Sequence, residues 1–142
     1  MNLTQSAYFF FIILASLLSG CNPRGHIEAA EGAVKVFHDR YNSQRYEAIY
    51  DEAGPAFRAS ASKRDFIAYE ANSHEKLGEL KSAEIANYNI LYLFSGPQVR
   101  LDYNSQFSNG HAVESFEIRF KNDKPLVDAY RIDTPLLEEK RR

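Results

Sequence analysis

The spacing of apolar residues changes at Gly78, and this change constrains the fold more than any other feature of the sequence. Before Gly78, apolar residues recur at spacings of three and four, which is typical of amphipathic helices. After Gly78, four segments rich in β-branched and aromatic residues are separated by turn-forming residues, which is typical of strands. Helices followed by strands predict an α+β domain, with N-terminal helices packed on a curved four-stranded antiparallel sheet.

Three stretches before Gly78 have helical character. The first is a helix ending near Asn42, and its apolar stripe consists of Ile27, Ala30, Val34, Phe37 and Tyr41. A second, short stripe begins at Tyr46 and must stop at Gly54-Pro55, because proline disfavours helix in the residue before it. Ser62 followed by Asp65 approximates a capping box, which predicts a third helix over about residues 63–77.

Four antiparallel strands are expected at residues 82–94, 98–108, 112–121 and 126–133. The clearest turn signal is the pair Asn109-Gly110, which favours a tight type I′ hairpin between Phe107 and Val113. No internal repeat divides the chain. We therefore expect one domain.

Composition limits the function and the source of stability. The chain of 142 residues carries a formal net charge of -2, so no basic surface for nucleic acid is expected. Cys21 is the only cysteine and cannot form an internal disulfide. Packing must therefore hold the fold, and ten Phe and nine Tyr supply large apolar surfaces for it.

The N-terminal segment is predicted to be a targeting signal. Residues 8–18 have the sequence YFFFIILASLL, which as a helix would extend about 16 Å, about half of a bilayer's hydrocarbon thickness. This length is too short for a permanent span and fits the apolar region of a signal peptide. The next residues, Leu18-Ser19-Gly20-Cys21, resemble the lipobox of bacterial lipoproteins.

The lipobox resemblance implies cleavage between Gly20 and Cys21 and attachment of a diacylglyceryl group to the Cys21 sulfur. The freed amine is acylated as well in diderm bacteria, and two or three lipid chains give a stable membrane anchor. Asn22 follows the cysteine where an aspartate would be the usual signal for inner-membrane retention. The expected location is therefore the cell envelope, at the outer membrane and facing the periplasm, if the host is Gram-negative.

These signals divide the chain into four parts. Residues 1–20 are the expected signal peptide and 21–26 the lipidated cysteine with a short tether. Residues 27–133 are the expected α+β domain and 134–142 a charged tail.

The expected domain resembles the NTF2-like (cystatin-like) domains, including uncharacterised lipoprotein and secreted members. The resemblance covers roughly residues 27–133 and is carried by Val36-Phe37, the run Tyr46 to Tyr50, Phe57-Arg58, Phe66, Leu77-Gly78, the run Val99 to Tyr103, Phe107 to Gly110, and Glu114-Ser115-Phe116. It implies a cone-shaped fold with a pocket between sheet and helices, and it implies no particular activity.

Glu114 and Asp128 are the candidate acid–base residues of such a pocket. Glu114 alternates in phase with Phe116, and Asp128 in phase with Tyr130, so regular strands would direct both carboxyl groups inward. Burial raises the pKa of a carboxyl group and suits it to act as a general acid or base. The alternatives for Glu114 are a position at the wet end of its strand or an ion pair with Arg100, Arg119 or Arg131.

The inward face of the last strand is ambiguous, because Val127 and Ala129 on the opposite face from Asp128 are also apolar. Four histidines have no metal-ligand spacing and are expected at the surface, namely His26, His38, His74 and His111. No cofactor or metal is expected.

The preferred interpretation is a membrane-anchored lipoprotein whose domain binds a small ligand or an envelope protein without catalysis. One alternative is a pocket enzyme that uses Glu114 or Asp128 in proton transfer. A further alternative is a structural partner that forms homodimers or assembles with other proteins of the envelope.

Overall fold

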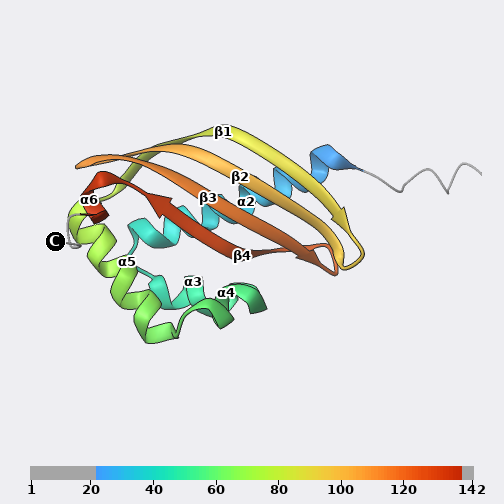
Figure 1. Ribbon diagram of the computed structural model, residues 1–142, viewed down its shortest axis with the longest axis horizontal. Coiled ribbons are helices and arrows are strands. Elements are labelled where there is room, and N and C mark those ends of the chain that lie inside the picture. The colour runs from blue at the N-terminus through green and yellow to red at the C-terminus, as the bar shows by residue number, and fades with distance from the viewer. Residues whose placement is uncertain (1–21, 139–142) are drawn as a thin grey trace, which may run out of the picture.

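The computed structural model describes residues 22–138, which form helices followed by an antiparallel sheet (Figure 1). The predicted signal peptide, the lipobox with Gly20 and Cys21, and residues 139–142 lie outside the described residues. The helices are α2 (Pro23–Asn42), α3 (Tyr46–Glu52), α4 (Pro55–Ser60), α5 (Lys63–Leu77) and α6 (Pro135–Glu138). The strands are β1 (Leu80–Leu93), β2 (Gly96–Phe107), β3 (Gly110–Lys121) and β4 (Lys124–Asp133).

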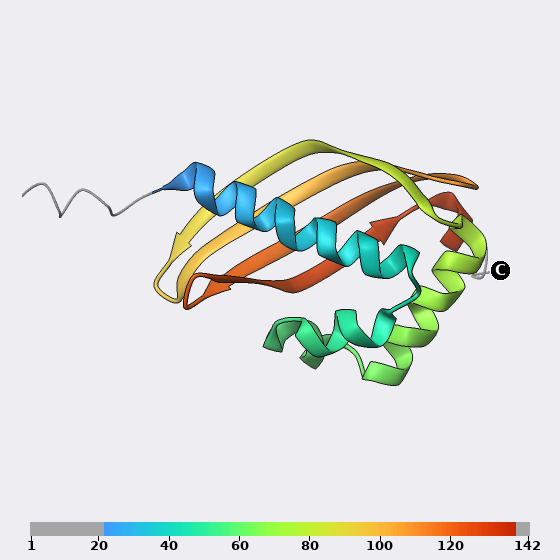
Figure 2. The same cartoon turned by 180° about the vertical axis from the view of Figure 1, so that it is seen from behind.

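The four strands form one open, curved sheet in the order β1-β2-β3-β4. Figure 2 shows α2 lying along one face of the sheet, with α3, α4 and α5 grouped below it on the side of β4. The backbone NH of Gly54 donates to the Val127 carbonyl at 2.7 Å, which joins the α3–α4 connection to β4. The predicted α+β class with a curved four-stranded antiparallel sheet is confirmed.

Buried and more exposed side chains alternate along β2 and β3, and the buried ones form the sheet side of the core. Every second residue from Val99 to Phe107 is buried, and so is every second residue from Ala112 to Phe120. The Phe116 ring packs against Phe37 of α2 at a centroid distance of 5.1 Å and against Tyr130 of β4 at 4.9 Å. The core therefore lies between α2 and the inner face of the sheet, as the alternating pattern predicts.

The N-terminal helix begins earlier than the expected boundary at residue 27, so residues 23–26 are helical and are not part of a tether. Asn22 is the N-cap, and its side-chain oxygen accepts from the Gly25 backbone NH at 3.0 Å. Pro23 occupies the first turn, where its missing NH is not needed. Asn22 and Pro23, which lie in the expected tether, are thus the start signal of α2.

The Asn109-Gly110 turn prediction is wrong in position. Phe107 pairs with Gly110, so Ser108 and Asn109 form the loop. The Asn109 side chain donates to the Lys76 carbonyl at 3.1 Å, which ties this hairpin to the end of α5. The positive φ angles of a type I′ turn occur instead at Asn122 (50°) and Asp123 (60°), between β3 and β4.

The expected charged tail is partly folded. Residues Pro135–Glu138 form the short helix α6, and the Lys76 ammonium group donates to the Leu136 carbonyl at 3.2 Å. Leu136 and Leu137 pack against the core, which explains why these residues are ordered against α5. Within residues 22–138, no helix is both long enough and apolar enough to cross a bilayer.

Two glycines give a matched test of this fold. Gly78 ends α5 with φ of 76°, and an added Cβ would lie 2.9 Å from the Ser108 Cβ, so Gly78→Ala should lower the unfolding free energy by about 1–3 kcal/mol. Gly32 lies inside α2 with nothing within 4 Å of an added Cβ, so Gly32→Ala should raise it by about 0.5–1 kcal/mol. Urea denaturation of both variants measures the difference, and equal effects would contradict the positions given to these glycines.

Candidate functional site

A buried carboxylate lies at the centre of the fold. Glu114 is 1% exposed, and three side chains surround its two oxygens. The Ser105 hydroxyl donates to Oε2 at 2.5 Å and the Tyr130 hydroxyl donates to Oε1 at 3.0 Å. The Nε2 atom of His38 lies 3.1 Å from Oε2 and donates when that nitrogen carries the hydrogen. The carboxylate thus has partners on both oxygens, which is the condition for burying such a group.

Each partner of Glu114 comes from a different element. His38 follows Phe37 in α2 and lies one turn from Val34 and Tyr41, so it shares the inward stripe of that helix. Ser105 is on β2 and Tyr130 on β4, on either side of β3. The Glu114 carboxylate therefore joins one helix to three neighbouring strands.

Two expectations about these residues are wrong. His38 is not at the surface, because α2 packs that part of its face on Tyr103 and Phe116. Glu114 is neither at a wet strand end nor paired with Arg100, Arg119 or Arg131, since its partners are all uncharged or imidazole groups. Of the remaining histidines, His26 and His74 are partly buried and His111 is exposed.

A second buried carboxyl group has no such partners. Glu70 of α5 is 0% exposed, and neither of its oxygens makes a hydrogen bond. Burial raises the pKa of Glu70 from 4.5 to about 8, and the negative charge of Glu114 contributes in the same direction. Glu70 is therefore mainly protonated at neutral pH and has an O–H group to donate.

Tyrosines surround the two carboxyl groups. Burial raises the pKa of Tyr130 well above 10.0, and the nearby charges of Glu114 and Glu70 add to that effect. Burial also raises the pKa of Tyr41, with Glu70 contributing next, and raises the pKa of Tyr103 to about 12. These hydroxyl groups stay neutral and remain hydrogen-bond donors over the whole physiological pH range.

Glu70 is one of the residues that line a pocket, which we call the Glu70 pocket. Its volume is about 570 Å³, and it lies between α4, α5 and the strands β3 and β4. Apolar and aromatic groups form most of its wall: Ala56, Phe57, Ala61, Phe66, Tyr69, Ala129 and Tyr130. Its polar side chains are those of Ser60, Asp65, Glu70, Glu117, Arg119 and Asp128. An apolar wall with a few polar groups is typical of small-molecule sites of this size.

Asp128 faces inward but its carboxylate is fully engaged in structural contacts. Oδ1 accepts from the Ala56 backbone NH in the first turn of α4 at 3.2 Å, and Oδ2 accepts from Arg119 Nε at 2.7 Å. A Cβ on Gly54 would collide with Oδ1, so the glycine permits this close approach. Asp128 therefore positions α4 over the Glu70 pocket, and each of its two oxygens already accepts a hydrogen bond.

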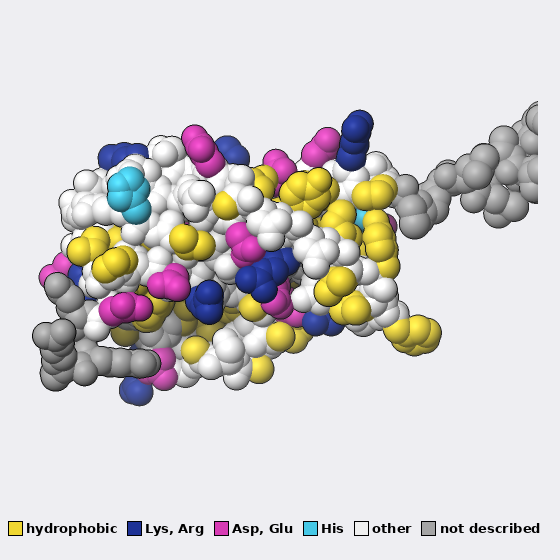
Figure 3. All heavy atoms as spheres, turned by 45° about the horizontal axis from the view of Figure 1, so that its top comes forward, with side chains coloured by type: hydrophobic (Ala, Val, Ile, Leu, Met, Phe, Trp, Pro, Cys, Tyr) yellow, Lys and Arg dark blue, Asp and Glu magenta, His cyan; other side chains and the backbone are white. Residues whose placement is uncertain are grey.

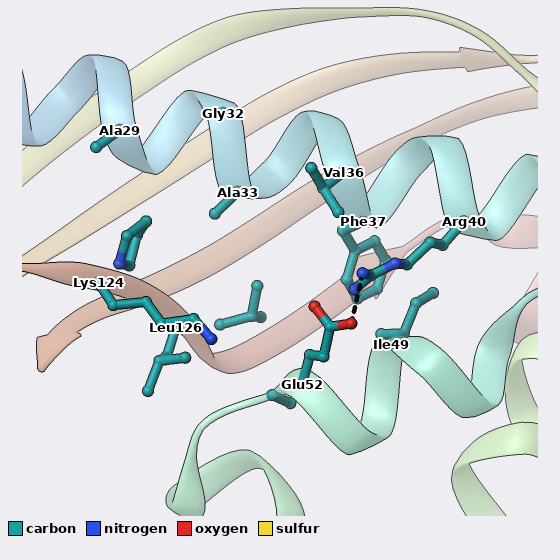
Figure 4. A pocket seen from close by; sticks show the side chains of 13 residues that line it. Ala29, Gly32, Ala33, Val36, Phe37, Arg40, Ile49, Glu52, Lys124 and Leu126 are labelled. Atoms are coloured by element: carbon teal, nitrogen blue, oxygen red, sulfur yellow. Dashed lines mark ion pairs between the residues drawn. The ribbon is translucent and has the colours of Figure 1, made fainter.

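A second hollow, the α2–α3 groove, lies between these two helices and the start of β4 (Figure 4). Its volume is about 320 Å³. Small and apolar side chains such as Ala33, Val36 and Phe37 line it, and the ion pair of Arg40 with Glu52 at 2.7 Å crosses one end. The groove has no buried group in need of a hydrogen-bond partner, so the Glu70 pocket is the stronger candidate site.

Sequence reasoning missed Glu70 and the partners of Glu114. A signal for Glu70 was present, because it lies at helical spacing from Phe66, Ser73 and Leu77, all of which are buried. No comparable signal links His38 to Glu114, since 76 residues separate them. Within residues 22–138, no group of three or more His, Cys, Asp and Glu side chains is placed to hold a metal ion.

No protein-family model matches this chain, and no curated protein is significantly similar to it. The candidate site therefore rests on its own geometry.

Titration of Glu70 predicts how stability changes with pH. In the unfolded chain the Glu70 carboxyl group has its ordinary pKa of 4.5 and ionises above that pH. In the folded chain its pKa is raised to about 8, so it keeps its proton up to that pH. The folded state binds the extra proton between these values, so the stability due to protonated Glu70 is full below pH 4.5 and is lost as pH rises to 8. In this window, the unfolding free energy of the wild type should fall by about 1.4 kcal/mol per pH unit relative to that of Glu70→Gln.

Urea denaturation of the wild type and Glu70→Gln across this pH range measures the effect. Glu75→Gln, at an exposed position of the same helix, is the control and should follow the wild-type profile. Parallel profiles for the wild type and Glu70→Gln would contradict the raised pKa of Glu70.

Proposed function

We propose that this chain is a lipid-anchored protein of the bacterial cell envelope that binds a small ligand without catalysis. The observation that carries the binding proposal is Glu70, a buried carboxyl group without a hydrogen-bond partner among the residues that line a largely apolar pocket. Leaving such a group unpaired costs stability, and a ligand that supplies the partner recovers it. The α+β architecture is also consistent with the proposed membership of the NTF2-like group.

The chemistry of the pocket indicates the class of ligand. Protonated Glu70 offers an O–H donor, and the rings of Phe57, Phe66 and Tyr69 offer apolar contact area. The complementary ligand is a small, mostly apolar molecule that carries a hydrogen-bond acceptor such as a carbonyl or hydroxyl oxygen.

The contacts of the two candidate acid–base residues favour binding over catalysis. Glu114 is enclosed by its three partners, and Asp128 holds Arg119 and α4. A general acid or base must reach the reacting group of the substrate, and Glu114 is too enclosed to do so. Asp128 lines the pocket, but both of its oxygens already hold structural hydrogen bonds. Glu114 is in this proposal a positioning group for the helix and strands around the pocket.

The pocket proposal is tested by filling the Glu70 pocket and the α2–α3 groove in turn. Ala61 lines the Glu70 pocket and Ala33 lines the α2–α3 groove, whereas the exposed Ala59 is in neither set of lining residues. Native mass spectrometry of the protein extracted from its own envelope should find a bound small molecule on the wild type and on Ala59→Phe. Ala61→Phe should reduce its occupancy at least tenfold, about the loss expected when one good contact of roughly 1.4 kcal/mol is removed.

Glu70 variants separate hydrogen bonding from shape. Glu70→Gln keeps a donor and should retain the molecule, whereas Glu70→Leu removes the donor and should lose it. If Ala33→Phe loses the bound molecule and Ala61→Phe retains it, the ligand belongs to the α2–α3 groove and this choice of site is overturned. Absence of any bound molecule from the wild type would contradict the binding proposal.

The anchor is tested at the lipobox. Cys21→Ala removes the thiol that would carry the diacylglyceryl group, so this variant should accumulate as a larger, unprocessed or soluble form without labelled palmitate. Ser19→Ala keeps a small residue before the cleavage point and should incorporate label normally. Palmitate label that persists in Cys21→Ala would contradict the anchor.

A further inference from the structure

Strand β1 exposes more large apolar side chains than any other element among residues 22–138. These side chains are Ile85, Tyr88, Leu91, Tyr92 and Leu93, followed by Phe94 in the turn to β2. Phe94 is fully exposed. Four consecutive apolar residues, 91–94, therefore end at the tip of the β1–β2 hairpin, which we call the hairpin tip.

The hairpin tip is apolar on both faces of the sheet. Val99 is fully buried, so Pro97, two residues before it on the same strand, is also on the inner face of the sheet. Tyr92 pairs with Pro97, so the Tyr92 side chain is on the inner face as well. Leu91 and Leu93 are offset from Tyr92 by one residue and project from the outer face. Because exposed apolar groups are on both faces of the tip, only an apolar environment that surrounds the tip would cover all of them.

The hairpin tip lies beside the first turn of α2. The His26 ring packs against Tyr92 at a centroid distance of 6.2 Å and against Phe120 at 4.8 Å. Figure 1 shows that α2 begins at the same end of the molecule as the β1–β2 and β3–β4 hairpins, and Figure 3 shows hydrophobic side chains gathered there. The exposed cations Arg24, Lys121 and Lys124 are on the elements that meet at this end, where Asp123 is the acidic residue of the β3–β4 turn.

Cys21 directly precedes Asn22 in the sequence, and Asn22 is the first described residue at this end. Asn22 caps α2, and His26 in the next turn already contacts Tyr92. Lipid chains on Cys21 would therefore hold the hairpin tip against the membrane surface.

We propose that the hairpin tip inserts Leu91, Leu93 and Phe94 into the same lipid leaflet that holds the acyl chains of Cys21. This inference rests on the proposed lipid anchor. Tyr92 then lies at the level of the headgroups, where amphipathic aromatic rings concentrate, and Arg24, Lys121 and Lys124 face acidic phospholipids. The domain is fixed to the membrane at two points and has a defined orientation.

A second copy of the chain is the competing occupant, because β1 is an edge strand with unpaired backbone groups. A face-to-face dimer would cover the inner or the outer apolar side chains, and an edge-to-edge dimer would leave both sets exposed. Neither arrangement covers Phe94 together with Leu91 and Leu93 on one face and Tyr92 on the other. A lipid leaflet covers them all.

Tryptophan fluorescence tests the insertion directly, because the chain contains no tryptophan. Phe94→Trp places the only indole at the hairpin tip. Val113→Trp places it at an exposed position near the opposite end of the sheet, where Val113 pairs with Asn104 and Asp133. The full lipidated proteins are reconstituted in vesicles of phosphatidylethanolamine and phosphatidylglycerol whose acyl chains are brominated. Intact mass measures the lipid on Cys21 separately.

The tryptophan emission of Phe94→Trp should lie at a shorter wavelength than that of Val113→Trp. The brominated acyl chains should also quench it several-fold more strongly. Adding Leu93→Glu should return the quenching to the Val113→Trp level while the lipid mass is unchanged. Equal quenching of the two reporters would overturn the hairpin contact, whatever the mass shows. A blue shift without vesicles that grows with protein concentration would also overturn it and assign the tip to a second copy. Quenching without lipid on Cys21 would support the hairpin contact and contradict the anchor.

Discussion

The buried Glu114 carboxylate is the interaction on which the arrangement of the helices and the sheet depends. Its three partners come from α2, β2 and β4, so removing the carboxylate would leave His38, Ser105 and Tyr130 without a shared acceptor. A buried charge contributes little net stability compared with an apolar group of the same size, but breaking such a network is costly. The network therefore specifies where α2 crosses the sheet, while the packing of Phe37 and Phe116 supplies the apolar burial at that crossing.

The charge of Glu114 also influences the nearby pocket. Burial at Glu70 is the main cause that disfavours ionisation of its carboxyl group, and the negative charge of Glu114 adds to that effect. The two carboxyl groups consequently differ: one is hydrogen-bonded on both oxygens, and the other is without partners and keeps its proton to about pH 8. The hydrogen-bonding capacity of the pocket thus follows mainly from the burial of Glu70, and Glu114 contributes to it although Glu114 itself is enclosed.

The elements of this fold were predictable from local pattern, and their connections were not. The helix over residues 63–77 and the inward face of Glu114 follow directly from periodicity and alternation. The turn at Ser108-Asn109 departs from the sequence signal because Asn109 is held by the carbonyl of Lys76, a contact between distant segments. His38 illustrates the same limit: its place on the inward stripe of α2 was readable, but its partner on β3 depends on how the helix packs. Strand β1 gave no usable alternation at its tip, since apolar residues occupy both faces there.

Arg119 links the hairpin tip to the Glu70 pocket, the two regions for which a function is proposed. Its Nη1 atom donates to the Ser95 hydroxyl in the β1–β2 turn at 3.3 Å, and its Nε donates to Asp128 at 2.7 Å. Asp128 in turn accepts from the backbone of Ala56, where α4 begins beside the Glu70 pocket. A continuous series of hydrogen bonds therefore runs from the hairpin tip to one wall of the pocket. If the tip is held in a leaflet, this series fixes the direction in which that wall faces relative to the membrane, so a ligand would enter the pocket at a set orientation to the lipid surface.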